Sequence, residues 1–318
     1  MSQKNKILII KHGYSETFEK QVSEITSLGD VLRTTVLLHL YKEQHVTWLT
    51  DAKAAPLLYG NPYIDKLLLY NMTSMFQLEA EHFDVVINLE KVPGICAFTD
   101  KIHAWKKLGY RFNPLTGEAE AYDRAEDALK ISKDPDHKKH HGKTWQEALF
   151  EMVGATWKGE SYVLGYKPQV KKKFDLGFNY EVGTKWSIKA WPRQNWDVLA
   201  RELSEYSITF QQGKSNIYEY IDWIASCRVL VSNDSLGLHI ALALGIPVIG
   251  MFGPTPYSEV ADYGLGYFLK PDEKLFPCMP CLDSECHNSS FCMSTLKVET
   301  VVEAVRSVML GSPAGRYK

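Results

Sequence analysis

The stretch Arg228–Phe252, RVLVSNDSLGLHIALALGIPVIGMF, predicts a strand, a helix and a second strand in succession. Arg228–Ser232 is an apolar strand segment, and Leu236–Leu244 is an apolar helical segment that ends at Gly245. Pro247–Phe252 is again a short apolar strand. Two strands joined by a helix in this way indicate a β-α-β unit with parallel strands.

The same alternation of short strands and helical patterns occurs on both sides of a linker-like segment, Lys158–Lys173, which carries glycines, Pro168 and consecutive lysines. We expect strands at Lys6–Lys11, His45–Thr50, Asp84–Leu89, Asp175–Tyr180 and Ile208–Gln211, and helices at Val31–Tyr41, Trp145–Val153, Trp191–Leu203, Ile217–Ala225 and Val298–Leu310.

The sequence therefore predicts an α/β protein in which two Rossmann-like domains face a central cleft. Residues 1–165 form the N-terminal domain and residues 166–318 the C-terminal domain. The last helix is free to pack back on the N-terminal domain.

The composition is that of a globular protein, because 45% of the 318 residues are hydrophobic and 23% are charged. The formal net charge of −2 gives no electrostatic case for binding nucleic acid. The longest apolar run, Ile240–Phe252, is shorter than the ~20 residues that span a bilayer. The apolar part of the first residues, Ile7–Ile10, is too short for a signal peptide. We therefore expect a cytoplasmic protein without a transmembrane segment.

Two strand-to-helix turns carry a carboxylate where open α/β sheets bind ligands, beyond the carboxyl ends of the strands. Asp30 ends the turn Ser27–Asp30, and Asp234 lies in the turn Ser232–Ser235. Either each aspartate is a helix N-cap, which stabilises a helix by about 1 kcal/mol, or the two line a ligand site.

A third candidate is the loop Gly183–Pro192, which links a predicted strand to a predicted helix. Thr184, Lys185 and Lys189 offer a hydroxyl group and two ammonium groups to a phosphate beside a helix N-terminus. The alternative is an ordinary surface loop with two lysines. The chain has neither GxxxxGK[ST] nor GxGxxG, which argues against a P-loop and against the usual dinucleotide site.

Four motifs in this order resemble those of the family 9 glycosyltransferases, the ADP-heptose:lipopolysaccharide heptosyltransferases. They are GDVLRTT at Gly29–Thr35, KAWP at Lys189–Pro192, SNDSLGLH at Ser232–His239 and FGPT at Phe252–Thr255. The resemblance runs from about Lys6 to Met293. It implies a GT-B fold and an inverting transfer that needs no metal or other cofactor. It also implies an acceptor on the N-terminal domain and a nucleotide sugar on the C-terminal domain.

The resemblance also assigns roles to single residues. Asp30 matches the family's base, which takes the proton of the acceptor hydroxyl. Lys189, with Thr184, matches the groups that hold the donor diphosphate, and Asp234 matches the acid that contacts the donor sugar. The donor-binding residues implied in this way are Thr184, Lys185, Lys189, Asp234, Ser235, Gly237 and His239. For His239 the alternative is a packed helix residue.

Four cysteines lie close together, at Cys278, Cys281, Cys286 and Cys292. Their spacing is that of a compact site of four thiolates, which suits a structural zinc or iron ion. Bacterial autotransporter heptosyltransferases carry an iron-binding cysteine cluster near this point, and this sequence resembles them locally. The alternative is four reduced thiols or disulfides.

The resemblance assigns no role to two further segments. Residues 12–28 are longer than the family's usual loop before the base, and they either shape the acceptor site or form a surface excursion. The run His137–Lys143 is either a solvated loop or a contact for an anionic acceptor.

We interpret the chain as a glycosyltransferase that moves a heptose from ADP-heptose to a hydroxyl of lipopolysaccharide core or a related surface polysaccharide. A lipid-linked acceptor would bring the protein to the inner membrane as a peripheral protein. One alternative is transfer of heptose to a protein acceptor. Another is a non-catalytic nucleotide-sugar- or metal-binding protein on the same scaffold.

Overall fold

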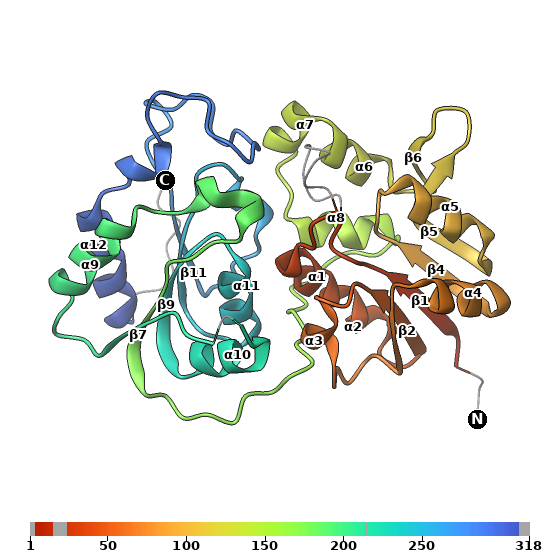
Figure 1. Cartoon of the computed structure of the whole chain (residues 1–318), viewed down its shortest axis with the longest axis horizontal. Helices are drawn as coiled ribbons and strands as arrows, with labels where there is room; N and C mark the ends of the chain where they lie inside the picture. The colour runs from red at the N-terminus through yellow and green to blue at the C-terminus, as the bar shows by residue number, and fades with distance from the viewer. Residues whose placement is uncertain (1–3, 15–23, 214, 312–318) are drawn as a thin grey trace. The chain divides into compact units, whose positions relative to one another are not determined.

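A computed structural model describes residues 4–14, 24–213 and 215–311 of the chain (Figure 1). The chain divides into two compact units, residues 1–166 and residues 167–318. Each unit is built around its own mostly parallel sheet. Within the described ranges, no helix has the length and apolar character needed to cross a membrane.

The first unit holds a six-stranded sheet in the order β3-β2-β1-β4-β5-β6, in which only the β5–β6 pair is antiparallel. Its strands are β1 (Lys6–Ile10), β2 (His45–Thr50), β3 (Lys66–Leu69), β4 (His82–Asn88), β5 (His103–Asn113) and β6 (Glu118–Ala121). Its helices are α1 (Leu28–Thr34), the 3-10 turn η2 (Thr35–Leu37), α2 (Leu38–Tyr41), α3 (Ala55–Leu58), α4 (Met72–Ala80), α5 (Pro93–Lys101), α6 (Glu126–Lys133), α7 (Pro135–His140) and α8 (Trp145–Met152).

The second unit holds a five-stranded parallel sheet in the order β11-β10-β9-β7-β8. Its strands are β7 (Phe174–Asn179), β8 (Ile208–Phe210), β9 (Cys227–Asn233), β10 (Val248–Met251) and β11 (Gly266–Leu269). Its helices are η3 (Thr184–Lys189), α9 (Arg193–Glu202), α10 (Ile217–Ala225), α11 (Leu236–Ala243), η4 (Tyr257–Glu259), η5 (Cys292–Thr295) and α12 (Val298–Met309). The last helix, α12, packs on α9 and on β9, β10 and β11 of this sheet.

The strand order of each sheet reverses at one point. In the first sheet the chain moves outward from β1 in one direction and continues from β4 in the other, and in the second sheet the same happens between β7 and β9. At such a reversal the flanking helices lie on opposite faces, so the carboxyl ends of the two strands leave room for a ligand. Polar residues at these two edges are therefore the first candidates for function.

The sequence locates most elements to within two residues, and three segments differ in an informative way. The predicted helix Val31–Tyr41 begins at Leu28 and tightens into the 3-10 turn η2, where the Thr34 and Thr35 hydroxyls bond to backbone oxygens three or four residues before them. Pro192 is the N-cap of α9 rather than part of its first turn.

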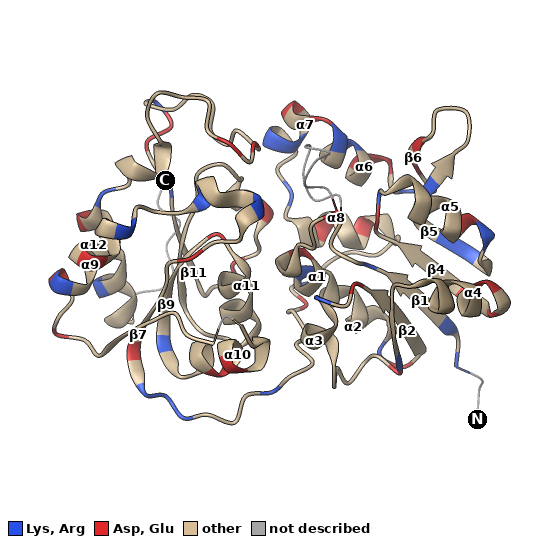
Figure 2. Ribbon diagram, in the orientation of Figure 1, with Lys and Arg blue, Asp and Glu red and all other residues tan. Residues whose placement is uncertain are grey.

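The third difference is the run His137–Lys143, which is not a loop along its whole length. Its first residues belong to α7, because the Asp134 side chain accepts hydrogen bonds from the amides of Asp136 and His137. Figure 2 shows that α7 carries both acidic and basic side chains, so it does not present a purely basic face.

Gly109 on β5 shows how closely the backbones of the first sheet approach each other. Its φ is +88°, and a Cβ built there would lie 1.9 Å from the backbone oxygen of Asn88 on β4.

We expect Gly109→Ala to destabilise the protein by about 3 kcal/mol or more, measured by urea unfolding. Gly94→Ala on α5, where a Cβ meets nothing within 4 Å, is the control. It should be neutral or stabilising by up to about 1 kcal/mol, and equal effects of the two substitutions would contradict the prediction.

Candidate functional site

Lys189 and Asp234 form an almost buried ion pair in the second unit. Lys189 Nζ lies 2.6 Å from Asp234 Oδ2, and the two side chains are 14% and 10% exposed. Thr255 Oγ1 donates a hydrogen bond of 2.6 Å to the same carboxylate oxygen. The fold thus brings together residues from the end of η3, from the turn after β9 and from the loop after β10.

The pair is charged under ordinary conditions. Burial alone would raise the pKa of Asp234, but the charges of Lys189 and His239 and the hydrogen bonds from Lys189 and Thr255 lower it to about 2. His239, on α11, is itself buried, with 5% of its surface exposed. A carboxylate that accepts hydrogen bonds suits sugar hydroxyls, and the adjacent ammonium suits a phosphate.

A buried hydrogen-bond network supports the turn that carries Asp234. Asn179, the last residue of β7, donates from Nδ2 to the hydroxyls of Ser232 and Ser235 at 2.7 and 2.9 Å. Its Oδ1 accepts a bond of 2.6 Å from the Tyr220 hydroxyl. A Cβ at Gly237 would lie 2.4 Å from that hydroxyl oxygen. Ser235 and Gly237 therefore let the β7 edge and α11 approach closely.

The loop before α9 is fixed to the same edge of the sheet. The Trp191 amide donates to Asn233 Oδ1 at 3.0 Å, and its indole donates to the Leu296 backbone oxygen at 2.9 Å. Of the other predicted phosphate ligands, Thr184 is exposed and Lys185 is 7% exposed. The structure joins Lys189 with Asp234 directly.

The helix-cap interpretation of the two aspartates is wrong. The N-cap of α1 is Ser27, and Asp30 lies within the first turn. The N-cap of α11 is Ser235, and Asp234 precedes the helix and faces Lys189. A carboxylate near a helix N-terminus is favoured by the helix dipole without being the cap.

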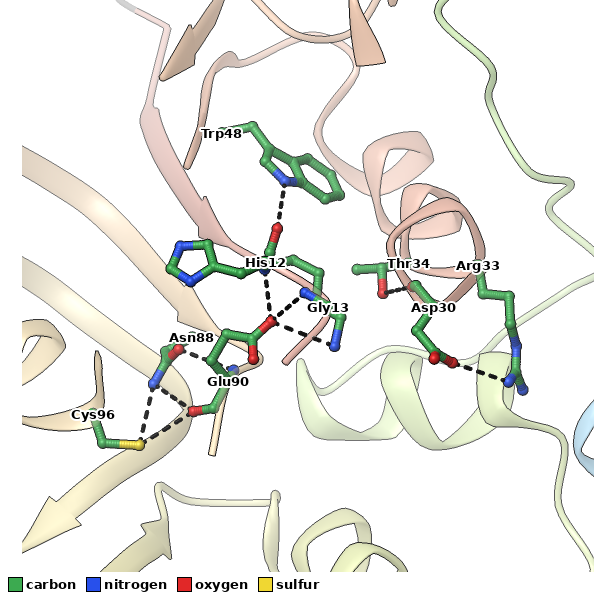
Figure 3. Close-up of polar contacts among 10 residues, drawn as sticks. His12, Gly13, Asp30, Arg33, Thr34, Trp48, Asn88, Glu90 and Cys96 are labelled. Atoms are coloured by element: carbon green, nitrogen blue, oxygen red, sulfur yellow. Dashed lines mark hydrogen bonds and ion pairs between the residues drawn. The ribbon is translucent and has the colours of Figure 1, made fainter. Parts of the chain in front are cut away.

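Asp30 lies on α1 of the first unit. Its side chain is 23% exposed, and its Oδ1 lies 3.4 Å from Arg33 Nη1, one turn further along the helix (Figure 3). Its backbone oxygen accepts a hydrogen bond from the Thr34 hydroxyl at 2.8 Å. The carboxylate is therefore partly accessible and lies beside a positive charge.

A buried carboxylate, Glu90, lies just after β4 in the first unit and contacts the residues that follow β1 (Figure 3). Its Oε1 accepts hydrogen bonds from the amides of His12 and Gly13 at 2.6 and 2.8 Å, and it lies 3.6 Å from Lys11 Nζ. Asn88 Oδ1 accepts the Glu90 amide at 3.0 Å. Burial, and then the charge of Lys11, lower the pKa of His12 to about 3, so its imidazole is neutral.

The four clustered cysteines do not form a metal site in the structure. Cys286 is exposed, Cys278 and Cys281 are partly exposed, and Cys292 is buried in the core of the second unit. The Cys278 sulfur accepts a hydrogen bond from Asn288 Nδ2 at 3.2 Å. In the part of the chain that the structure describes, no three His, Cys, Asp or Glu side chains are placed to hold a metal ion. The predicted structural zinc or iron is therefore not supported.

The cysteine-rich loop instead packs against the loop that carries Thr255. The Leu282 amide donates to the Pro254 backbone oxygen at 2.8 Å. A Cβ at Gly253 would lie 2.6 Å from Met293 Sδ and 3.2 Å from Cys292 Sγ. Burial raises the pKa of the Cys292 thiol to about 11. The Cys292 thiol is therefore protonated, and it packs against the loop that carries the FGPT motif.

Sequence reasoning assigned no role to several polar residues at the carboxyl edges of the sheets. Asn179 ends β7, Asp51 follows β2, and Glu90 follows β4. The rule that singled out Asp30 and Asp234, a polar residue just beyond a strand, also applies to these three. Thr255 lies in the quoted FGPT motif, and only the fold reveals its bond to Asp234.

Comparison with protein families shows that residues 209–290 match the model of "Glycosyltransferase family 9 (heptosyltransferase)". The chain is 44% identical over 58 residues to lipooligosaccharide heptosyltransferase 2 of Haemophilus influenzae, a match that covers 18% of this chain and 16% of the relative. It is 20% identical to lipopolysaccharide heptosyltransferase 1 of Campylobacter coli over 90% of this chain and 98% of the relative. The matched segments span 16% to 31% of the first three curated relatives, all named lipooligosaccharide heptosyltransferase 2.

Solved structures resemble the chain over nearly its whole length. A family 9 glycosyl transferase from Veillonella parvula matches 98% of both chains with a TM-score of 0.63 and 18% identity. The E. coli heptosyltransferase WaaC with ADP-2-deoxy-2-fluoro heptose covers 95% of this chain and 99% of its own, with a TM-score of 0.60 and 16% identity. The iron-containing dodecameric glycosyltransferase TibC from enterotoxigenic E. coli matches 97% of this chain and 78% of its own chain, with a TM-score of 0.57 and 12% identity. These likenesses confirm the predicted fold class.

The ion pair makes a quantitative prediction for stability. We expect Lys189→Ala and Asp234→Ala each to destabilise the protein by about 3–5 kcal/mol, because each leaves a buried charge unpaired. The double substitution should cost less than the sum of the two. Arg228→Ala is the control, since Arg228 pairs with Asp175 at 3.0 Å but is 58% exposed. It should cost at most about 1 kcal/mol.

The same pair fixes a pH dependence. The pKa of Asp234 is lowered from 3.8 to about 2, so its contribution to stability is fully present above about pH 4 and is lost as the pH falls toward 2. In urea unfolding across this range, the stability difference between wild type and Asp234→Asn should shrink toward pH 2. A stability difference that stays constant from pH 5 to pH 2 would contradict this prediction. Additive losses of stability in Lys189→Ala and Asp234→Ala would contradict the prediction for the double substitution.

Proposed function

We propose that the chain, which resembles the heptosyltransferases of glycosyltransferase family 9, transfers a heptose from ADP-heptose to a hydroxyl group of a bacterial surface glycan. The acceptor class is lipopolysaccharide core or a related polysaccharide, and the transfer inverts C1 without a metal ion. The observation that carries the proposal is the buried cluster of Lys189, Asp234 and Thr255. Two of its members lie within residues 209–290, the segment that matches the family.

The second unit, residues 167–318, holds the donor in this proposal. Lys189 neutralises the charge that grows on the leaving diphosphate as the bond to C1 breaks, so the positive charge accelerates the reaction. Asp234 accepts hydrogen bonds from the sugar hydroxyls, with its orientation set by Lys189 and Thr255. Ser235, Gly237, His239, Thr184 and Lys185 complete the donor-binding set.

The first unit, residues 1–166, holds the acceptor. Asp30 takes the proton of the acceptor hydroxyl while the new bond to C1 forms and the bond to ADP breaks, which inverts C1. Its exposure supports this role, since a carboxylate that is 23% exposed can reach a substrate. Arg33 Nη1 lies 3.4 Å from Asp30 Oδ1 and helps to orient the carboxylate.

Heptose transfer to Ser or Thr of a protein is the second candidate. The cluster of four cysteines and the fold likeness to TibC, a glycosyltransferase described as iron-containing, favour it. The glycan acceptor remains the first choice, because the curated relatives are named as lipooligosaccharide and lipopolysaccharide heptosyltransferases. A non-catalytic nucleotide-sugar-binding protein is the third candidate, and turnover separates it from the other two.

Donor binding is the first test. In isothermal titration against ADP-heptose and GDP-, UDP- and dTDP-sugars, we expect saturable binding of ADP-heptose. Lys189→Ala and Asp234→Ala should each weaken it by about tenfold or more, the effect of losing a charge-assisted hydrogen bond. Arg228→Ala, at the other end of β9, should bind as wild type does. Tighter binding of another nucleotide sugar would contradict the donor assignment, and no binding to any of them would contradict the proposed function.

The base is the second test. Asp30→Asn should lower the rate of ADP release in the presence of acceptor by about 100-fold or more, as expected for losing a general base. Its affinity for ADP-heptose should stay unchanged. Asp123→Asn, on an exposed side chain of the same unit, is the control, and all assays are run with and without EDTA. Full activity in Asp30→Asn would refute its role as base, and activity lost in EDTA would refute metal independence.

A further inference from the structure

The connection from β1 to α1 has two ends that the structure describes, and these ends touch each other. The Ser27 amide donates to the Gly13 backbone oxygen at 2.8 Å. Gly13 has a φ of +87°, and a Cβ there would lie 2.7 Å from the Ser27 backbone oxygen. Of the predicted 12–28 excursion, residues 15–23 lie outside the described residues. The contact between Gly13 and Ser27 closes the base of this connection, and only glycine fits at Gly13.

Asp51, the first residue after β2, binds the outgoing end of the connection. Its Oδ2 accepts a hydrogen bond of 2.6 Å from the Tyr14 hydroxyl on that end. Its Oδ1 accepts the Lys53 amide at 2.8 Å, which fixes the carboxylate itself. The Thr26 side chain on the returning end also helps to lower the pKa of this carboxylate. One charged group therefore acts on two segments that are twelve positions apart in the sequence.

The electrostatics of Asp51 agree with this geometry. Burial would raise its pKa, but the hydrogen bonds from Tyr14, Lys53 and Thr26 outweigh burial and lower it. Burial and the bond to Asp51 raise the pKa of Tyr14, so the phenol remains a donor. The bond between them therefore has an ionised acceptor, which makes it about twice as strong as a neutral one.

The connection is also held from the opposite side of β1. Glu90, after β4, accepts the amides of His12 and Gly13 (Figure 3). The two strands that flank β1 in the sheet, β2 and β4, thus each supply a carboxylate to the segment that leaves β1. Glu90 binds its backbone and Asp51 binds its side chains.

The returning end leads directly into the first turn of α1. Ser27 is the N-cap of that helix, and its backbone oxygen accepts the Val31 amide at 3.3 Å. Asp30 lies three residues after Ser27, in the same turn. Whatever fixes Thr26 and Ser27 therefore also fixes the point from which the Asp30 side chain extends.

We propose that Asp51 is a positioning residue of the acceptor half of the site: its carboxylate binds the Tyr14 hydroxyl, next to the contact between Gly13 and Ser27, and thereby holds the helical turn that carries Asp30. This inference rests on the proposed function, in which Asp30 is the base. Such a base must be held within a fraction of an ångström of the acceptor hydroxyl, and a displacement of about 1 Å can cost about 100-fold in rate.

The surroundings of Tyr14 provide a clean variant for the test. Its ring packs edge-on against the rings of His12 and Tyr70, at centroid distances of 5.4 and 6.4 Å. This packing does not involve the hydroxyl, so Tyr14→Phe removes the bond to Asp51 and leaves the ring in place. Tyr70→Phe removes a hydroxyl from the same aromatic group and is the matched control.

The experiment measures ADP release from ADP-heptose, with heptose-deficient lipopolysaccharide as acceptor, and the Kd for ADP by titration. In Asp51→Asn and Tyr14→Phe we expect kcat to fall by about 10- to 100-fold. The Kd for ADP should stay within about twofold of wild type, because the donor residues belong to the other unit. The double variant should be no slower than Asp51→Asn alone, and Tyr70→Phe should match wild type. The peptide containing residues 24–31 should exchange its amide hydrogens faster in Asp51→Asn.

Wild-type kcat in both variants would overturn the proposal. So would a loss of activity that merely follows the unfolded fraction in a thermal melt, or a loss shared by Tyr70→Phe. Failure of the proposed function gives a different result, because wild-type protein would then show no ADP release with this donor and acceptor.

Discussion

A buried carboxylate at the edge where each sheet reverses its strand order is the constraint on which the site depends. Such a group is stable in a protein interior only if positive charge and hydrogen bonds surround it. Asp234 meets this condition with Lys189 and Thr255, and Glu90 meets it with Lys11 and two backbone amides. The loops that supply these partners can take few other conformations without leaving a charge unpaired. These buried carboxylates and their partners therefore restrict the conformation of the loops at both sheet edges.

The fold was largely predictable from the sequence because the strands are short apolar runs between helices with clear apolar faces. The stretch Arg228–Phe252 defines β9, α11 and β10 to within one or two residues. Cys96 and Cys227, which lie in apolar runs of the sequence, are both buried. Apolar periodicity is a local signal, so it can be recognised in a single sequence. The 3-10 turn η2 was not predictable in this way, because it depends on which backbone oxygen each threonine hydroxyl finds.

The candidate site was predictable only in part, because its residues meet through the fold. Lys189 and Asp234 were both singled out, but 45 positions separate them, and nothing in the spacing says that they form an ion pair. Asp51 carries no local signal beyond its place after a strand, and the FGPT motif that contains Thr255 does not reveal its bond to Asp234. The interpretation of Asp30 and Asp234 as N-caps failed for the same reason. Ser27 and Ser235 occupy the two N-cap positions, and neither side chain accepts a capping hydrogen bond.

The four cysteines of the predicted metal site have different surroundings in the structure. Cys292 is drawn into the core beside Met293, where burial keeps its thiol protonated, while Cys286 lies at the surface. Metal binding requires deprotonated thiols, and the side chains as placed form no ligand group among the described residues. The loop contacts Gly253 and Pro254, next to the threonine that bonds to Asp234. In the proposed function this packing would support the donor half of the site, as the hydrogen bonds of Asp51 would support the acceptor half.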